Sequence, residues 1–285
     1  MDYRNPDALV TTDWLAENIA EPLVSIVDAS FYLPTANRNP KQEFDDCHIQ
    51  GAVFFDINKI ADKDTDLPHM LPDAKDFSNH ISNLGISNNH HVICYDTNGG
   101  PMAAMRAWWS FRVFGHDRVS VLSGGLPKWQ DENRSTSSIA SSITPQIFTA
   151  KHNPNLVKNI EQITENIKTQ KYQLVDARSK GRYNGTEPEP RVGLRSGHIP
   201  GAINLPFNSL LDSKQFMTMR SANEISTIIM ESGIDLSKPI ISSCGSGVTA
   251  APLVMALYLI GNKEVAIYDG SWTEWASRSD QPIII

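Results

Sequence analysis

The chain has 285 residues and a formal net charge of −7 at pH 7. This acidic balance argues against nucleic acid or an anionic membrane as the main partner, although a local basic pocket can still bind a small anion. Hydrophobic residues make up 40% of the chain and charged residues 20%, which is the composition of an ordinary soluble protein with one or two domains.

Neither a secretory leader nor a membrane helix is expected. Residues 1–6 show no apolar core after a basic start, and no apolar run approaches the roughly 20 residues that a membrane helix needs. The three cysteines, Cys47, Cys94 and Cys244, are too few and too scattered for a disulfide framework, and no pair has the spacing of metal ligands. The sequence therefore predicts a cytoplasmic protein without a metal site.

In the first half of the chain, three short apolar runs have the composition of buried strands. They lie at 25–29, 91–96 and 119–125. Continuous apolar strands between helix-like segments are typical of parallel sheets that helices cover on both faces. A Ser-rich stretch with few large apolar residues follows at 134–142 and predicts a flexible linker.

The second half of the chain repeats this order of elements. Strand-like runs lie at 173–177, 239–244 and 265–270. Helices are predicted at 159–167, where three isoleucines share one face, at 222–232, and at 250–260, which is almost wholly apolar.

An internal repeat defines the domain organisation. The motif His-Ile-x-Gly-Ala at 48–52 recurs at 198–202, and the strand ending in Asp28 recurs, at nearly the same spacing, as the one ending in Asp176. Such a pattern indicates two copies of one domain of about 130 residues rather than a solenoid. We expect a first domain at 1–134, a linker at 135–148 and a second domain at 149–285.

Cys244 stands where a predicted strand gives way to a glycine-containing loop and then to an apolar helix. Ligands of open parallel sheets bind beyond the carboxyl ends of the strands. The two loop glycines let the backbone curl around the sulfur, and the following helix directs its free N–H groups toward the loop. This arrangement favours an anion, so it predicts a nucleophilic thiolate at Cys244. The alternative is a buried structural cysteine, a role that suits Cys47 and Cys94 better.

The position that matches Cys244 in the first half is Asp96. A carboxylate cannot form a persulfide, so only the second copy is expected to be catalytic, with the first copy acting as scaffold and pocket wall. His48 and His198 belong to the motif that both halves share, and we therefore expect them to be structural.

These features together resemble the rhodanese-like sulfurtransferases. The tandem repeat, the two His-Ile-x-Gly-Ala motifs and the loop from Cys244 to Thr249 carry the resemblance, which extends from about Val10 to Ser277. It implies two tandem rhodanese-like domains in an α/β fold, each an open parallel sheet with helices on both faces. No metal or organic cofactor is implied.

The loop Cys-Gly-Ser-Gly-Val-Thr is similar to that of the 3-mercaptopyruvate sulfurtransferases within this family. Members that prefer thiosulfate carry cationic residues just after the cysteine, whereas Gly245 and Ser246 stand there in this chain. A thiosulfate dianion favours positive charge beside the sulfur, while mercaptopyruvate carries its charge on a remote carboxylate. The remaining predicted substrate-binding positions of the loop are Gly247, Val248 and Thr249.

The segment 181–191 is similar to the substrate loop of the mercaptopyruvate enzymes. The resemblance assigns Arg182 and Arg191 to the carboxylate and keto group of the substrate. Guanidinium groups suit this role because they stay charged and can grip a carboxylate with two parallel hydrogen bonds. The alternative is a surface loop in which both arginines pair with Glu187 and Glu189. A binding role for Arg195 is left open.

Family members are also proposed to use a loop serine with a histidine and an aspartate of the first domain to manage protons. Ser246 and His69 fit the first two roles. The place of the aspartate falls on Asn58, which is a departure from the pattern. Asparagine can orient a histidine but cannot stabilise imidazolium charge, so a complete Ser-His-Asp relay is not expected.

The resemblance implies that sulfur passes from 3-mercaptopyruvate through a Cys244 persulfide to thioredoxin, a small thiol or cyanide, with release of pyruvate. Thiosulfate as the donor is the nearest alternative. A cysteine phosphatase would need an arginine closing a longer loop, but Ala250 stands six positions after the cysteine and the next arginine is Arg278. An interaction module without activity would fit the first half alone.

Overall fold

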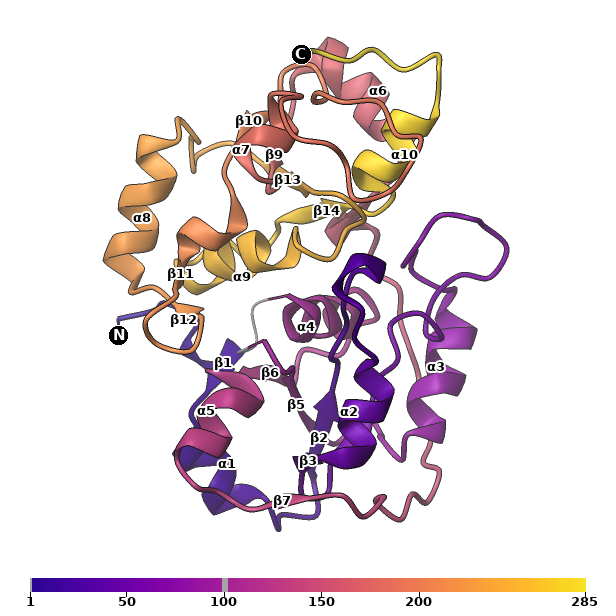
Figure 1. The fold of residues 1–285 in the computed structure, drawn as a ribbon, viewed down its shortest axis with the longest axis vertical. Helices are drawn as coiled ribbons and strands as arrows, with labels where there is room; N and C mark the ends of the chain where they lie inside the picture. Colours follow the sequence, from indigo (N-terminus) through magenta and orange to yellow (C-terminus); the bar gives the residue numbers. More distant parts are fainter. Residues whose placement is uncertain (1, 99–101) are drawn as a thin grey trace.

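The computed structural model describes residues 2–98 and 102–285 and shows two similar halves, one below the other in Figure 1. Within these residues, each half contains one five-stranded parallel sheet. The strand order is β1-β6-β5-β2-β4 in the first sheet and β10-β9-β13-β14-β8 in the second. The predicted duplication of one α/β domain is confirmed.

The first domain follows the predicted order of strands and helices. Its sheet strands are β1 (Leu9–Val10), β2 (Val24–Asp28), β4 (Val53–Phe54), β5 (His91–Tyr95) and β6 (Val119–Leu122). Its helices are α1 (Thr12–Asn18), α2 (Pro40–Asp46), α3 (Ala74–Asn83), α4 (Ala103–Val113) and α5 (Gly125–Asp131), with 3-10 turns at η1 (Pro6–Ala8) and η2 (Pro34–Ala36).

The second domain repeats these elements. Its sheet strands are β8 (Val157–Lys158), β9 (Gln173–Asp176), β10 (Ile203–Asn204), β13 (Ile240–Ser243) and β14 (Ala266–Tyr268). Its helices are α6 (Ile160–Thr169), α7 (Lys180–Tyr183), α8 (Ala222–Glu231), α9 (Ala251–Leu259) and α10 (Ser271–Ser277). A small hairpin, β11 (Leu211–Asp212) with β12 (Thr218–Met219), and the turns η3 (Pro154–Leu156) and η4 (Phe207–Leu210) complete it.

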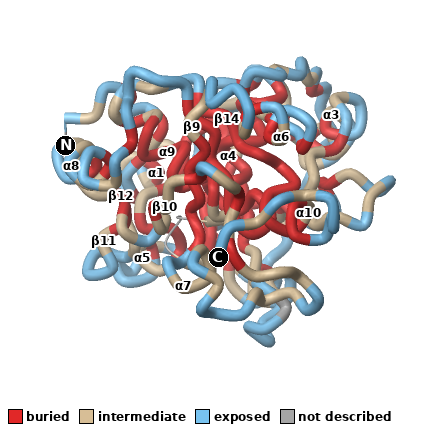
Figure 2. Tube along the Cα trace, turned by 90° about the horizontal axis from the view of Figure 1, so that it is seen from above, coloured by how far each residue is buried: buried red, intermediate tan, exposed pale blue. Residues whose placement is uncertain are grey.

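Helices cover both faces of each sheet, because successive strand residues point to opposite faces. In β5, Val92 and Cys94 join one apolar cluster, whereas Ile93 and Tyr95 join another that includes residues of α1, α2 and α5. The buried interior runs through α4, α9 and the central strands of the second sheet (Figure 2). The predicted fold class is therefore correct.

Helices α4 and α9 form the centre of the interface between the domains. They contact each other, and one apolar cluster contains residues of both (Figure 1). Every residue of α4 is buried, and so is every residue of α9 except Tyr258. A helix that is apolar on all sides, such as α9, must be buried on all sides. Here its own sheet and the other domain bury it. Among the described helices, none has both the length and the apolar character to cross a bilayer.

The segment between the domains is bound to the first domain rather than free. β7 (Thr136–Ser137) pairs with β3 (His48–Ile49), and the Ser141 hydroxyl donates to the carbonyl of Ala52 at 2.8 Å. The Ser-rich composition predicted a flexible linker, and in the structure a backbone pairing and the Ser141 hydroxyl connect this segment to the first domain. We propose the domain limits 1–134 and 149–285, with 135–148 as a connection that follows the surface of the first domain.

Candidate functional site

Cys244 stands directly after β13 and opens the loop that leads into α9, as predicted. Its side chain is buried, with the residue 1% exposed. Its N–H donates to Oγ of Ser271 at 3.1 Å, and its carbonyl accepts the N–H of Trp272 at 2.9 Å. The backbone at the cysteine is thus fixed by the start of α10, which follows the neighbouring strand β14.

Two glycines leave space in this loop for arginine side chains. A Cβ atom on Gly245 would lie 2.9 Å from Nη2 of Arg182. At Gly247, where φ is +75°, it would lie 2.8 Å from Nη1 of Arg106 and 2.9 Å from the carbonyl oxygen of Asp269. A side chain at Gly247 would be both strained and crowded, so the sequence needs glycine there.

A cavity of about 350 Å³ lies beside the loop, between the two domains. Loop residues 245, 246, 248 and 249 form one wall with Arg182, Pro190 and Arg191. The first domain supplies the opposite wall, which consists of Phe31, Tyr32, Leu33, Thr35, Ala36, Arg38, Asn98 and Met102. The expected pocket wall from the first domain is present.

Arg182, which is half-buried, belongs to a chain of ion pairs that continues into the buried interior. Its Nη2 lies 2.5 Å from Oε2 of Glu189, whose other oxygen lies 2.7 Å from Nη1 of Arg178. Arg178 also pairs with Asp176 at 2.6 Å. Burial acts to lower the pKa of Arg178, but Asp176 and Glu189 raise it above its usual value. Arg182 therefore lines the cavity, as expected of a substrate-binding residue, and it also pairs with Glu189, as expected of the alternative in which the loop arginines pair with glutamates.

Arg191 differs from Arg182, because no carboxylate of the described residues lies within ion-pair distance of it. Its Nη2 lies 3.4 Å from Oγ of Ser246 and 3.4 Å from Nε2 of His69. Burial lowers the pKa of Arg191, while the nearby Cys244 acts to raise it. The predicted residues Arg191, Ser246, His69 and Cys244 thus lie together in the structure.

His69 is buried, and it has a left-handed backbone with φ of +64°. Its ring packs edge-on against Phe31 at 4.6 Å between centroids. Burial, with the positive charges of Arg106 and Arg191, lowers the pKa of His69 to about 3, so the ring is neutral at pH 7. Nδ1 has no hydrogen-bond partner among the described residues. Asn58 is exposed and does not orient this ring, in contrast to the role its position suggested.

Other residues considered from the sequence have structural contacts. The guanidinium of Arg195 donates to backbone carbonyls of residues 275, 276, 278 and 281, and it does not line the cavity. His48 stacks on Phe44, and His198 stacks on Tyr183. In each case Nδ1 also lies within 2.9 Å of the carbonyl oxygen of that aromatic residue. The two motif histidines therefore fix local structure.

In the first domain, the place equivalent to the cysteine loop is occupied by a carboxylate. Asp96 accepts the N–H groups of Asn98, Ala103 and Ala104 at 2.9–3.1 Å, the last two at the start of α4. Residues 99–101 of this loop lie outside the described part. These backbone N–H groups, which could otherwise bind an external anion, donate to the Asp96 carboxylate instead.

The comparisons with known proteins identify the family of the chain. The model of the Rhodanese-like domain matches residues 11–132 and 159–278. The chain belongs to the rhodanese-like family.

Relatives of this rhodanese-like chain carry two kinds of name. It is 43% identical to the human 3-mercaptopyruvate sulfurtransferase, over 95% of this chain and 93% of the relative. It is 44% identical to the thiosulfate sulfurtransferase of Rattus norvegicus, with the same coverage. The crystal structure of the 3-mercaptopyruvate sulfotransferase SseA from Escherichia coli matches with a TM-score of 0.84 and 38% identity, covering 93% of this chain and 98% of that one.

Sequence reasoning missed four residues that surround the cysteine loop of this rhodanese-like chain. They are Arg106, Asp269, Ser271 and Thr273. An arginine within the otherwise largely apolar segment 103–113 was the available signal for Arg106, because a buried charge requires a partner. The other three follow the strand β14, where polar residues at a strand end mark the ligand side of the sheet.

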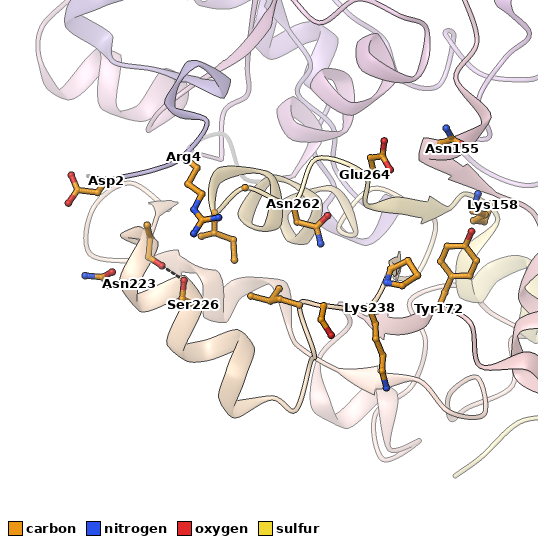
Figure 3. A pocket seen from close by; sticks show the side chains of 16 residues that line it. Asp2, Arg4, Asn155, Lys158, Tyr172, Asn223, Ser226, Lys238, Asn262 and Glu264 are labelled. Atoms are coloured by element: carbon orange, nitrogen blue, oxygen red, sulfur yellow. Dashed lines mark hydrogen bonds between the residues drawn. The ribbon is translucent and has the colours of Figure 1, made fainter.

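A hollow larger than the cavity beside Cys244 lies away from this site. Its volume is about 770 Å³, and Arg4, Lys158, Lys238 and Glu264 are among its lining residues (Figure 3). Pro239 and Glu264 precede β13 and β14, so this hollow is at the amino ends of the strands, opposite to Cys244. Size alone therefore does not locate the functional site.

Proposed function

We propose that the chain is a 3-mercaptopyruvate sulfurtransferase that carries sulfur as a persulfide on Cys244. The observation that carries this proposal is the position of the positive charge. The loop residues after the cysteine are uncharged, while Arg191, without a carboxylate partner among the described residues, faces the cavity beside Ser246. A donor with its charge on a carboxylate several bonds from the sulfur fits this arrangement.

The reaction begins with attack of the Cys244 thiolate on the sulfur of 3-mercaptopyruvate. A new S–S bond forms as the C–S bond breaks, and the electron pair of the C–S bond passes to carbon, giving the enolate of pyruvate. The enolate takes up one proton and leaves as pyruvate. Arg191 and Arg182 bind the carboxylate and keto group, and N–H groups of the loop residues 245–249 stabilise the sulfur anion.

Ser246 and His69 manage the proton that the enolate needs. Both lie at 3.4 Å from the same nitrogen of Arg191, so a substrate held by this arginine would contact them. Because the pKa of His69 is about 3, its neutral ring has one N–H to donate and one nitrogen to accept. The serine hydroxyl is the donor to carbon, and the ring exchanges protons with solvent.

In the second half of the reaction a thiol or cyanide removes the outer sulfur. The cavity is lined from both domains and Cys244 is buried, which favours a small thiol. Thioredoxin, whose reactive thiol would have to reach the same cavity, is the protein candidate. We place the enzyme in the cytoplasm, consistent with three free cysteines. An Arabidopsis thaliana relative, 44% identical and spanning 97% of this chain, is named mitochondrial, so cell fractionation tests this placement.

Thiosulfate is the second candidate donor, since the relative of that name is as similar as the mercaptopyruvate enzymes. A side-by-side assay of kcat/KM for both donors decides between them. We expect the value for 3-mercaptopyruvate to exceed that for thiosulfate by at least about tenfold, which corresponds to about 1.4 kcal/mol. Cys244→Ser abolishes turnover with either donor, whereas Cys47→Ser, outside the cavity, retains it. A preference for thiosulfate would overturn the assignment of the donor.

A further inference from the structure

Four carbonyl groups of the Cys244 loop accept hydrogen bonds from other residues of the protein. The carbonyl of Cys244 accepts the N–H of Trp272 at 2.9 Å, and that of Gly245 accepts the N–H of Thr273 at 2.9 Å. The carbonyl of Gly247 accepts Nη1 of Arg106 at 3.2 Å, and that of Val248 accepts the N–H of Ala251 at 3.2 Å. Four peptide groups of this loop therefore have a fixed orientation.

The orientation of each carbonyl also sets that of the next N–H. None of the described peptide bonds is cis, and in a trans peptide the C=O and the following N–H point in opposite directions. The N–H groups that follow the four held carbonyls belong to residues 245, 246, 248 and 249. Those four residues also line the cavity, and their N–H groups donate to no other atom of the described chain.

Thr273 holds the carbonyl of Gly245 with two donors. Besides its N–H, its hydroxyl donates to the same oxygen at 2.6 Å. Thr273 lies in the first turn of α10 and is buried, so water cannot replace the hydroxyl. Because both lone pairs of the Gly245 carbonyl accept hydrogen bonds, this peptide group resists rotation. The N–H of Ser246 belongs to the same peptide group, so its direction is fixed as well.

Arg106 holds the carbonyl of Gly247 from the other domain. Its Nη2 donates to the carbonyl of His69 at 2.7 Å and to Oδ1 of Asp269 at 2.6 Å, which leaves Nη1 directed at Gly247. The residue is 1% exposed. One guanidinium thus connects the histidine loop of the first domain with the cysteine loop and strand end of the second.

We propose that Thr273 and Arg106 are positioning residues for the sulfur anion on Cys244. By holding two carbonyls on the far side of the loop, they turn the N–H groups of Ser246 and Val248 toward the cavity, where these groups stabilise the thiolate and the persulfide. The inference rests on the proposed persulfide chemistry but not on the choice of donor. It also makes the site of the second domain dependent on a residue of the first.

The first test compares Thr273→Val with Thr273→Ser. Valine keeps the shape of threonine and loses the hydroxyl, whereas serine keeps the hydroxyl. We expect kcat to fall about tenfold in Thr273→Val, with KM changed less than about twofold, and near wild-type kcat in Thr273→Ser. The rate of alkylation of Cys244 by iodoacetamide at pH 7 should fall in parallel, because less thiolate is present.

The matched control is Thr164→Val. Thr164 also donates its hydroxyl to a backbone carbonyl of the second domain, that of Ile160 at 2.8 Å, but it lies on α6 outside the cavity. Its loss should leave kcat and the alkylation rate unchanged. Equal rates for Thr273→Val and wild type, or equal losses in Thr273→Val and Thr164→Val, would overturn the role of Thr273.

The second test compares Arg106→Lys with Arg112→Lys. Both arginines lie on α4, are buried and donate to the second domain, but Arg112 donates to the carbonyl of Lys263 and not to the cysteine loop. Lysine keeps the charge and loses the planar fork that reaches several acceptors. We expect kcat and the alkylation rate to fall at least about tenfold only in Arg106→Lys.

Equal activity of the two lysine variants would contradict the role of Arg106. If Arg106→Lys does not fold, the threonine series alone tests the proposal. A wild-type protein that forms no persulfide with either donor would refute the proposed function itself, whereas an active wild type with an unaffected Thr273→Val refutes only this inference.

Discussion

Arg106 of the first domain and Asp269 of the second form a buried ion pair, with Nη2 of the arginine 2.6 Å from Oδ1 of the aspartate. Their side chains are 2% and 4% exposed. The other carboxylate oxygen accepts the N–H of Leu71 at 2.7 Å, so the loop that carries His69 is bound on both sides. The two domains are therefore joined by polar as well as apolar contacts at the site where they meet.

Asp269→Asn should destabilise the protein strongly, because it leaves the positive charge of Arg106 buried without its partner. We expect the free energy of unfolding at pH 7 to fall by about 3–5 kcal/mol, measured by urea unfolding. Asp45→Asn removes one member of the exposed pair with Lys41 and should cost less than about 1 kcal/mol. Similar losses in the two variants would show that the buried pair contributes no more than a surface pair.

Stability should decrease in mild acid because of His69. The unfolded chain takes up a proton near pH 6.5, while the folded chain does so only near pH 3, so stability is lost as pH falls through this window. The advantage of wild type over His69→Gln in free energy of unfolding should shrink by about 2 kcal/mol between pH 6.5 and 5. A constant difference for His69→Gln would indicate that the ring is protonated in the folded protein.

Arg191 should matter more for 3-mercaptopyruvate than Arg38, although both line the cavity. Arg38 donates two hydrogen bonds to Glu43, whereas Arg191 pairs with no carboxylate of the described residues. We expect Arg191→Gln to lower kcat/KM by about 10²-fold, the worth of a charge-assisted hydrogen bond, and Arg38→Gln by less than about threefold. The measurement is steady-state kinetics. If kcat/KM falls equally in the two variants, Arg191 has no special role in binding the donor.

Asp28 should reduce stability at neutral pH. Burial raises its pKa to about 6 from a usual value of 3.8, so the folded carboxyl resists ionisation. As pH rises through this window the unfolded chain loses its proton first, and stability falls. The stability of Asp28→Asn relative to wild type should therefore increase by about 2 kcal/mol from pH 4 to pH 6.5. A difference for Asp28→Asn that does not change with pH would contradict the raised pKa.

Local sequence patterns were sufficient for the fold and for the position of Cys244 between a strand and an apolar helix. Ile160 and Ile163 mark the buried face of α6, and the apolar run after Cys244 forms α9. Both patterns act within one element, where spacing alone decides which side is buried. The segment 135–148 was harder to predict, because its hydrogen bonds go to residues far away in the chain.

The contacts across the domain interface could not be predicted from one chain. The three acceptors of Arg106 lie on His69, Gly247 and Asp269, in segments that only the packing of α4 against the second domain brings together. The same holds for Asn58: the family resemblance placed it where an aspartate would orient His69, but its side chain is exposed at the surface. Sequence spacing does not fix which residues meet when the partners belong to different loops.

Mass spectrometry of the chain after treatment with 3-mercaptopyruvate tests the account most directly. The peptide that contains Cys244 should gain about 32 Da, the mass of one sulfur atom, and lose it again when a thiol acceptor is added, as a covalent intermediate requires. The peptides of Cys47 and Cys94 should stay unchanged. Absence of the added mass at Cys244, while pyruvate is still released, would contradict sulfur transfer through this residue.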